Sequence, residues 1–348
     1  MPTRPPSSSK PRARVCVIHV GGTIGMTRDE SGAYRPQAGF LSQYMEGMPE
    51  LALDYIPSYE LIVLDPLLDS AEMGPSDWVR IAETIVERHD AFDGFVVVHG
   101  TDTMAYTASA LSFLIEGLKK PVILTGAQLT LAHPRSDGRE HLITSLSLAG
   151  RHQIPEVCIY FASNLLRGNR SQKVHNRDFV AFAAGNLLPL ARVGVNVEFN
   201  DHLILPIPEG PTRVVPIERD PEVAAIRLFP GMGPGMLEKM IDSPLEAVVL
   251  ETYGAGNAPT DARWLGVLAK AVHDRDLVVV NCSQCHGGAV VQELYGSGAG
   301  LAEAGVISGR DLTPEAALTK LYCLLAQGLA PSKVREKMGQ SLVGEMQT

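Results

Sequence analysis

The sequence has no long hydrophobic run among its 348 residues, and no apolar stretch approaches the ~20 residues that a membrane-spanning helix needs. Residues 1–14 also lack the apolar core of a secretory signal, so we expect a cytoplasmic protein without a membrane partner. There is no basic excess either, because 39 acidic residues outnumber 30 basic residues and give a formal net charge of −9. Without a basic stripe a nucleic-acid partner is not expected, and a small-molecule substrate is the default prediction.

Cysteine is scarce, and the five cysteines are odd in number, so the sequence does not indicate a disulfide framework. Residues 282–286 (CSQCH) match the attachment pattern of c-type haem, but such attachment requires export, which residues 1–14 do not support. Residues 21–25 (GGTIG) lack the spacing of a dinucleotide fingerprint, and no histidine pair has the spacing of a zinc site. We therefore expect neither a cofactor nor a metal.

Short β-branched runs alternate with helical patterns along the chain, which predicts an α/β fold made of two doubly wound α/β domains. The larger domain is expected at residues 15–190, after a disordered tail at residues 1–14. Prolines cluster where the alternation breaks, so an interdomain linker is expected at residues 191–220. The smaller, C-terminal domain then covers residues 221–348. Expected elements include strands at 15–20, 95–98, 122–124, 157–161, 223–228, 247–250 and 277–281, and helices from Pro75, from Asp102 or Thr103 to about Leu118, from Ser136 or Asp137, and from Pro314.

Two strands are each followed by glycine and threonine, in residues 21–25 (GGTIG) and 99–103 (HGTDT). Open α/β sheets carry their chemistry at the carboxyl ends of their strands, so Thr23 and Thr101 are candidate catalytic hydroxyls of a hydrolase. A second interpretation remains open, since glycines make tight turns and Thr or Asp caps helices without any further role. No histidine base lies in evident reach of a threonine nucleophile, so the base must come from elsewhere in the chain.

Further motifs extend along nearly the whole chain. They are residues 20–27 (VGGTIGMT), 94–114 (GFVVVHGTDTMAYTASALSFL), 121–128 (PVILTGAQ), 135–142 (RSDGREHL), 166–182 (LRGNRSQKVHNRDFVAF), 253–259 (YGAGNAP), 278–285 (VVVNCSQC) and 304–321 (AGVISGRDLTPEAALTKL). In these motifs the chain resembles the bacterial cytosolic, type I L-asparaginases of the asparaginase/glutaminase family. Only the first dozen or so residues fall outside the resemblance.

The resemblance implies hydrolysis of L-asparagine to L-aspartate and ammonia through a threonine acyl-enzyme. Thr23 matches the family's nucleophile, and Thr101 and Lys173 match a pair that relays a proton. Asp102 matches the residue that holds the α-amino group of the substrate. Tyr34 matches the tyrosine of a lid that closes over the first threonine, although one residue more than expected separates it from Thr23.

For the substrate's α-carboxylate, the resemblance implies a loop of Asp69, Ser70 and Ala71, next to Gly100, Thr101 and Asp102. Related enzymes carry Ser or Gln where this chain has Ala71, so the preference for asparagine over glutamine stays open. Cys285 matches a residue of a second, effector site. Glu251 stands where an arginine is expected there, and an acidic residue would repel the carboxylate of the effector.

The family also implies a homodimer or homotetramer. Two alternative functions remain: the asparaginase-like subunit of a tRNA amidotransferase, and a glutaminase-asparaginase of broad substrate use. A non-catalytic protein that binds or senses amino acids on the same scaffold is a third, weaker alternative.

Overall fold

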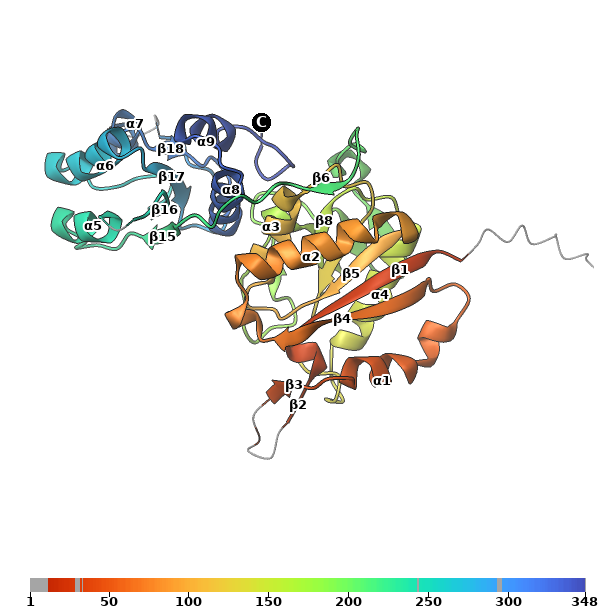
Figure 1. The fold of residues 1–348 in the computed structure, drawn as a ribbon. Helices are drawn as coiled ribbons and strands as arrows, with labels where there is room; N and C mark the ends of the chain where they lie inside the picture. The colour runs from red at the N-terminus through yellow and green to blue at the C-terminus, as the bar shows by residue number, and fades with distance from the viewer. Residues whose placement is uncertain (1–11, 29–31, 33, 243, 293–295, 348) are drawn as a thin grey trace, which may run out of the picture.

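The computed structural model describes residues 12–28, 32, 34–242, 244–292 and 296–347. It confirms an α/β architecture with a large N-terminal domain around a central sheet and a smaller C-terminal domain around a parallel sheet (Figure 1). None of the helices in the described part of the chain combines the length and apolarity that a membrane crossing requires.

The large sheet has eight strands in the order β13-β12-β9-β8-β7-β5-β1-β4. The neighbours β4, β1, β5, β7 and β8 run parallel, and β9, β12 and β13 are added antiparallel at one edge. The strands are β1 (Arg14–Gly21), β4 (Ser58–Leu68), β5 (Gly94–Val98), β7 (Val122–Thr125), β8 (Val157–Phe161), β9 (Asn164–Arg167), β12 (Ala191–Val193) and β13 (Val197–Phe199).

Helices cover both faces of this sheet, because its central strands bury side chains on both sides. In β1, Cys16 and Ile18 face one core, while Val15 and Val17 face the other, as the two-residue period of a strand requires. The first core lies under α2 (Pro75–Glu87) and α3 (Met104–Leu114), and the second under α1 (Phe40–Glu46) and α4 (Gly138–Arg151).

The C-terminal domain repeats this plan around a four-stranded parallel sheet, β15-β16-β17-β18. Two helices cover one face and three the other, and α8 also contacts the N-terminal domain through Tyr322, Cys323 and Ala326 (Figure 1). The elements are β15 (Val223–Arg227), α5 (Pro234–Ile241), β16 (Ala247–Thr252), α6 (Ala262–Asp274), β17 (Val278–Ser283), α7 (Gly296–Glu303), β18 (Ile307–Ser308), α8 (Pro314–Ala326) and α9 (Pro331–Met338).

Short strands pair outside the two sheets and correct several expected boundaries. These strands are β2 (Met26–Arg28) with β3 (Tyr34–Pro36), β6 (Ile115–Glu116) with β14 (Arg213–Val214), and β10 (Gln172–Lys173) with β11 (Phe182–Ala183). The helix expected to reach about Leu118 ends at Leu114, because the next two residues pair with β14. Single turns of 3₁₀-helix are η1 (Thr23–Gly25), η2 (Pro49–Ala52), η3 (Ser70–Glu72), η4 (His89–Ala91), η5 (Gly168–Arg170) and η6 (Asp201–Leu203).

The expected linker and tail are each partly wrong. Within residues 191–199, β12 pairs with β9 and β13 pairs with β12, so this segment extends the large sheet. At the other end, Arg14 begins β1, and the Arg12 guanidinium donates to the carbonyl of Ile56. Ordered structure therefore begins before residue 15, while residues 1–11 of the expected tail lie outside the described residues.

Candidate active site

The two threonine turns meet at the carboxyl edge of the large sheet, because β1 and β5 are parallel neighbours. A Cβ atom on Gly22, which has a φ of 90°, would lie 2.3 Å from the amide nitrogen of Gly100. Only glycine permits both this conformation and this approach. A Cβ atom on Gly100 would in turn lie 2.5 Å from Ser70 Oγ. Three loops that are far apart in the sequence are therefore in direct contact.

Thr23 begins η1 and is half-buried. Its hydroxyl has no hydrogen-bond partner among the described residues, whereas the neighbouring backbone is well supported. The Leu131 amide donates to the carbonyl of Ile24, and the Thr130 hydroxyl donates to the carbonyl of Met26. The turn therefore holds the backbone and leaves the Thr23 oxygen available for another group.

Thr101 is 6% exposed, and Lys173 reaches it from β10. The Lys173 ammonium donates to Thr101 Oγ1 over 2.7 Å and to Asp102 Oδ1 over 2.6 Å. The Lys173 side chain is 16% exposed and that of Asp102 is 66% exposed. Three of the residues expected to be catalytic therefore form one hydrogen-bonded group, with its carboxylate at the solvent side.

Residues 69–71, which are expected to bind the carboxylate, lie at the start of η3, directly after β4. Asp69 Oδ1 accepts from the amide of Ala71, so this side chain fixes the turn. Ser70 is 3% exposed, and its carbonyl accepts from the hydroxyl of Thr103 over 2.7 Å. Thr103 and Asp102 do not cap α3 through their side chains, which corrects that expectation. The Thr103 hydroxyl instead joins the Ser70 loop to the second threonine turn.

The side chain of His99 contacts the Thr101 turn, a role that the sequence analysis did not predict. Its ring is fully buried, and burial lowers its pKa to about 4, so the imidazole is neutral near pH 7. Nδ1 contacts the carbonyl of Gly100 at 2.6 Å and Nε2 contacts the Thr107 hydroxyl at 2.8 Å. Since a carbonyl only accepts, Nδ1 carries the proton and donates to Gly100. The conformation of the residue before Thr101 is therefore held by a buried histidine.

Tyr34 is not joined to this group. It lies in β3, 43% exposed, and the Arg28 guanidinium stands over its ring at 5.1 Å from the centroid. No hydrogen bond links Tyr34 to Thr23 in the described part of the chain, which leaves out most of the turn between β2 and β3. The sequence-based role of Tyr34 thus remains a prediction.

Cys285 follows β17, is exposed, and donates its amide to Ser283 Oγ. Glu251 lies in β16 and pairs with Arg227 over 3.1 Å. The acidic side chain that stands in place of the expected arginine therefore has a cationic partner of its own. Among the described residues, no group of three or more His, Cys, Asp or Glu side chains is arranged to hold a metal ion.

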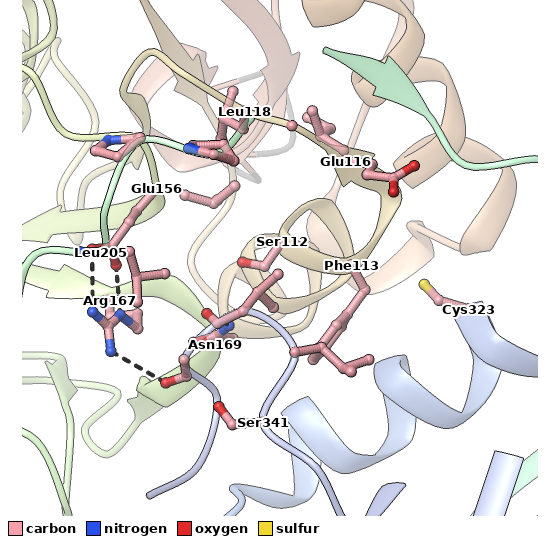
Figure 2. Close-up of a pocket in the computed structure, with 18 of the residues that line it drawn as sticks. Ser112, Phe113, Glu116, Leu118, Glu156, Arg167, Asn169, Leu205, Cys323 and Ser341 are labelled. Carbon is pink, nitrogen blue, oxygen red and sulfur yellow. Dashed lines mark hydrogen bonds and ion pairs between the residues drawn. The ribbon is translucent and has the colours of Figure 1, made fainter. Parts of the chain in front are cut away.

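A cavity of about 1070 Å³ lies away from the two threonine turns. It opens near the amino ends of β7 and β8, whereas the threonine turns follow the carboxyl ends of β1 and β5. Figure 2 shows Arg167 and Glu156 along one wall, opposite Phe113 and Cys323. Arg167 and Glu156 form a buried ion pair, so their charges are already satisfied. The cavity and the two threonine turns therefore lie at opposite ends of the strands of the large sheet.

The motifs and the geometry point to one class of protein, the amidohydrolases with paired threonines. Residues 14–205 match the family model described as Asparaginase, N-terminal, and residues 222–338 match the Glutaminase/Asparaginase C-terminal domain. The chain belongs to the asparaginase family.

Individual relatives agree with this assignment. The chain is 44% identical to L-asparaginase 1 of Escherichia coli (strain K12), over 95% of this chain and 97% of that protein. It is 41% identical to the 60 kDa lysophospholipase of Mus musculus, of which it spans 63%. The crystal structure of L-asparaginase I from Vibrio cholerae superimposes with a TM-score of 0.89 at 43% identity, covering 97% of this chain and all of the other.

Proposed function

We propose that the protein is an L-asparaginase, which hydrolyses L-asparagine to L-aspartate and ammonia. The observation that carries the proposal is the hydrogen-bonded group of Thr101, Lys173 and Asp102 beside Thr23, whose hydroxyl has no hydrogen-bond partner among the described residues. Together these four residues supply a nucleophile, a proton acceptor and a carboxylate at the carboxyl edge of the sheet.

In the first half-reaction, Thr23 Oγ1 attacks the carbonyl carbon of the substrate's side-chain amide. The Thr23 proton passes through Thr101 to Lys173 in its neutral form and returns to the leaving nitrogen. The C–N bond breaks, ammonia leaves, and an ester to Thr23 remains. Backbone N–H groups of the two glycine turns stabilise the oxyanion. Tyr34 is the second candidate for the base.

In the second half-reaction, water attacks the ester carbon and gives its proton to the same relay. The ester bond breaks, the Thr23 hydroxyl is restored, and aspartate is released. No other reactant is needed for either half.

The α-groups of the substrate fix its orientation. The exposed Asp102 carboxylate accepts from the α-ammonium, while Ser70 and backbone amides of its loop bind the α-carboxylate. Asp69 contributes by shaping this loop. Because Ala71 offers no polar side chain, the loop has one hydrogen-bonding group fewer than in relatives with Ser or Gln there.

We further propose a cytoplasmic location and a homodimer or homotetramer, as the family implies. The experiment that tests the function is ammonia release from free asparagine, measured without tRNA, glutamate or ATP. Turnover of asparagine alone supports the proposal. Turnover only with tRNA and ATP would favour the amidotransferase subunit, and equal kcat/KM for glutamine would favour the broad glutaminase-asparaginase.

A further inference from the structure

Lys173 owes its position to a very short strand. β10 consists of Gln172 and Lys173 alone, which pair with Ala183 and Phe182 of β11. A pairing of this length is marginal by itself. The lysine side chain is long and flexible, yet its ammonium has to stay within hydrogen-bond reach of Thr101. Something else must therefore hold the strand in place.

Gln172 provides a second attachment on the opposite side of the strand. Successive side chains of a strand point to opposite faces, so Gln172 points away from Thr101 and toward the C-terminal domain. Gln172 Nε2 donates to Glu315 Oε2 over 3.1 Å, and Gln172 Oε1 accepts from His286 Nδ1 over 2.8 Å. Both ends of the amide are thus used.

The two partners of Gln172 belong to different elements of the C-terminal domain. Glu315 lies in the first turn of α8, and His286 follows β17. An amide oxygen only accepts, so His286 Nδ1 carries a proton, and the amide nitrogen is left to face the carboxylate. The donor and acceptor pattern is therefore complete with one orientation of the Gln172 amide.

We propose that Gln172 is the positioning residue for Lys173, and that through it the C-terminal domain sets the distance between the lysine and Thr101. The inference rests on the proposed catalytic role of Lys173. Gln172 itself touches neither substrate nor reacting atoms, and it acts by fixing the backbone from which the lysine extends.

The surroundings of Glu315 make this attachment sensitive to charge. Glu251 of β16, Tyr106 of α3 and Cys282 of β17 all interact electrostatically with Glu315. Burial raises the Glu315 pKa to about 7, while the hydrogen bond from Gln172 opposes the rise. A second carboxylate at position 172 would therefore repel Glu315 at alkaline pH.

The first test is Gln172→Met, which keeps the length of the side chain and removes both hydrogen bonds. We expect kcat for asparagine to fall about 10- to 100-fold with KM within about twofold, since small misplacements of catalytic groups have costs of this order. Gln327→Met is the matched control, because Gln327 Nε2 donates to the Cys323 carbonyl at the other end of α8. The control should keep wild-type kcat.

The second test reverses the donor and the acceptor. Gln172→Glu should lower kcat relative to wild type most at pH 8 to 9, and the ratio should recover toward pH 6, where Glu315 can donate a proton. The double variant Gln172→Glu/Glu315→Gln restores one amide and one carboxylate in exchanged places. It should recover most of the wild-type kcat across the whole pH range.

Either of two results would overturn the inference. One is a Gln172→Met enzyme with wild-type kcat. The other is a loss of kcat that only follows a lower melting temperature and is not relieved in the double variant. Lys173→Met, measured in parallel, separates this question from the proposed function. If Lys173→Met is active, the catalytic scheme fails; if it is inactive while Gln172→Met is normal, only the positioning role fails.

Discussion

The two threonine turns occupy equivalent places in the fold but have opposite surroundings. Each follows a central parallel strand, and the glycines of the two turns touch. Thr101 is almost fully buried, and its hydroxyl is held by Lys173. Thr23 is half-buried, and its hydroxyl has no hydrogen-bond partner among the residues that the structure describes.

This difference supports the different roles that we propose for the two threonine hydroxyls. A hydroxyl that is hydrogen-bonded to a lysine nitrogen is suited to passing a proton along a fixed path, whereas an unpaired hydroxyl can approach a carbonyl carbon. The two turns also differ in the domains to which they are linked. The Thr23 turn hydrogen-bonds to Leu68, Gln37, Thr130 and Leu131, all of its own domain. The Thr101 group is linked through Lys173 and Gln172 to the C-terminal domain.

The largest effect is expected from Thr23→Ala, which removes the attacking oxygen. We expect kcat to fall by ~10⁴-fold or more, because a nucleophile cannot be replaced by its neighbours. The melting temperature should change little, since the hydroxyl makes no hydrogen bond in the described structure. Steady-state ammonia release and a thermal melt measure the two quantities. Retention of more than about a tenth of wild-type turnover would contradict the nucleophile assignment.

Thr101→Ala and Lys173→Met test the second turn. We expect each to lower kcat by about 10²- to 10⁴-fold, the usual range for loss of a general base. Since the two residues form one relay, the double variant should be no worse than the poorer single variant. Multiplicative losses in the double variant would show that they act separately, and a wild-type Lys173→Met enzyme would leave Tyr34 as the base candidate.

The sequence predicted the second of these two turns less completely than the first. Strand runs, glycines and the motif sufficed to place Thr23, Thr101 and Asp102 at one sheet edge, because local patterns determine where parallel strands end. The resemblance supplied Lys173, whose distance from Thr101 along the chain no local pattern bridges. The Thr103 bond to Ser70 was missed, because a threonine at a helix start is read as a cap.

Tertiary pairing explains the boundary errors as well. Residues 191–199 contain no proline, but they lie between Pro189 and Pro206 and were therefore included in the expected linker. They instead form β12 and β13 at the edge of the large sheet, a pairing that no local pattern specifies. The attachment of Gln172 to Glu315 depends on how two domains meet, which the sequence of neither domain specifies.

Asp102→Asn should have an intermediate effect and distinguishes two roles of this carboxylate. It accepts from Lys173 in the structure, and we propose that it also accepts from the substrate's α-ammonium. Losing a charge-assisted bond to the ammonium predicts a fall in kcat/KM of about 10- to 100-fold for asparagine. Succinamic acid, which lacks the α-amino group, should be affected much less. Equal losses for both substrates would mean that Asp102 acts only through Lys173.

The smallest change in turnover is expected from Glu315→Gln, which keeps an oxygen to accept from Gln172 but removes a titrating group from the domain interface. In the wild type, burial raises the pKa of Glu315 from 4.5 to about 7, so the folded chain binds this proton more tightly than the unfolded chain. The resulting stabilisation is complete below pH 4.5 and is lost as the pH rises to about 7, with a total on the order of 3 kcal/mol. Glu315→Gln should therefore flatten the fall in the free energy of unfolding between these pH values, as measured by denaturant titrations at each pH.

Thr23→Ala, which touches only the other turn, should keep the wild-type pH dependence of stability. If the two variants instead show the same pH dependence of the free energy of unfolding, Glu315 does not titrate at the domain interface. The pH sensitivity expected on the Thr101 side of the comparison is then wrong.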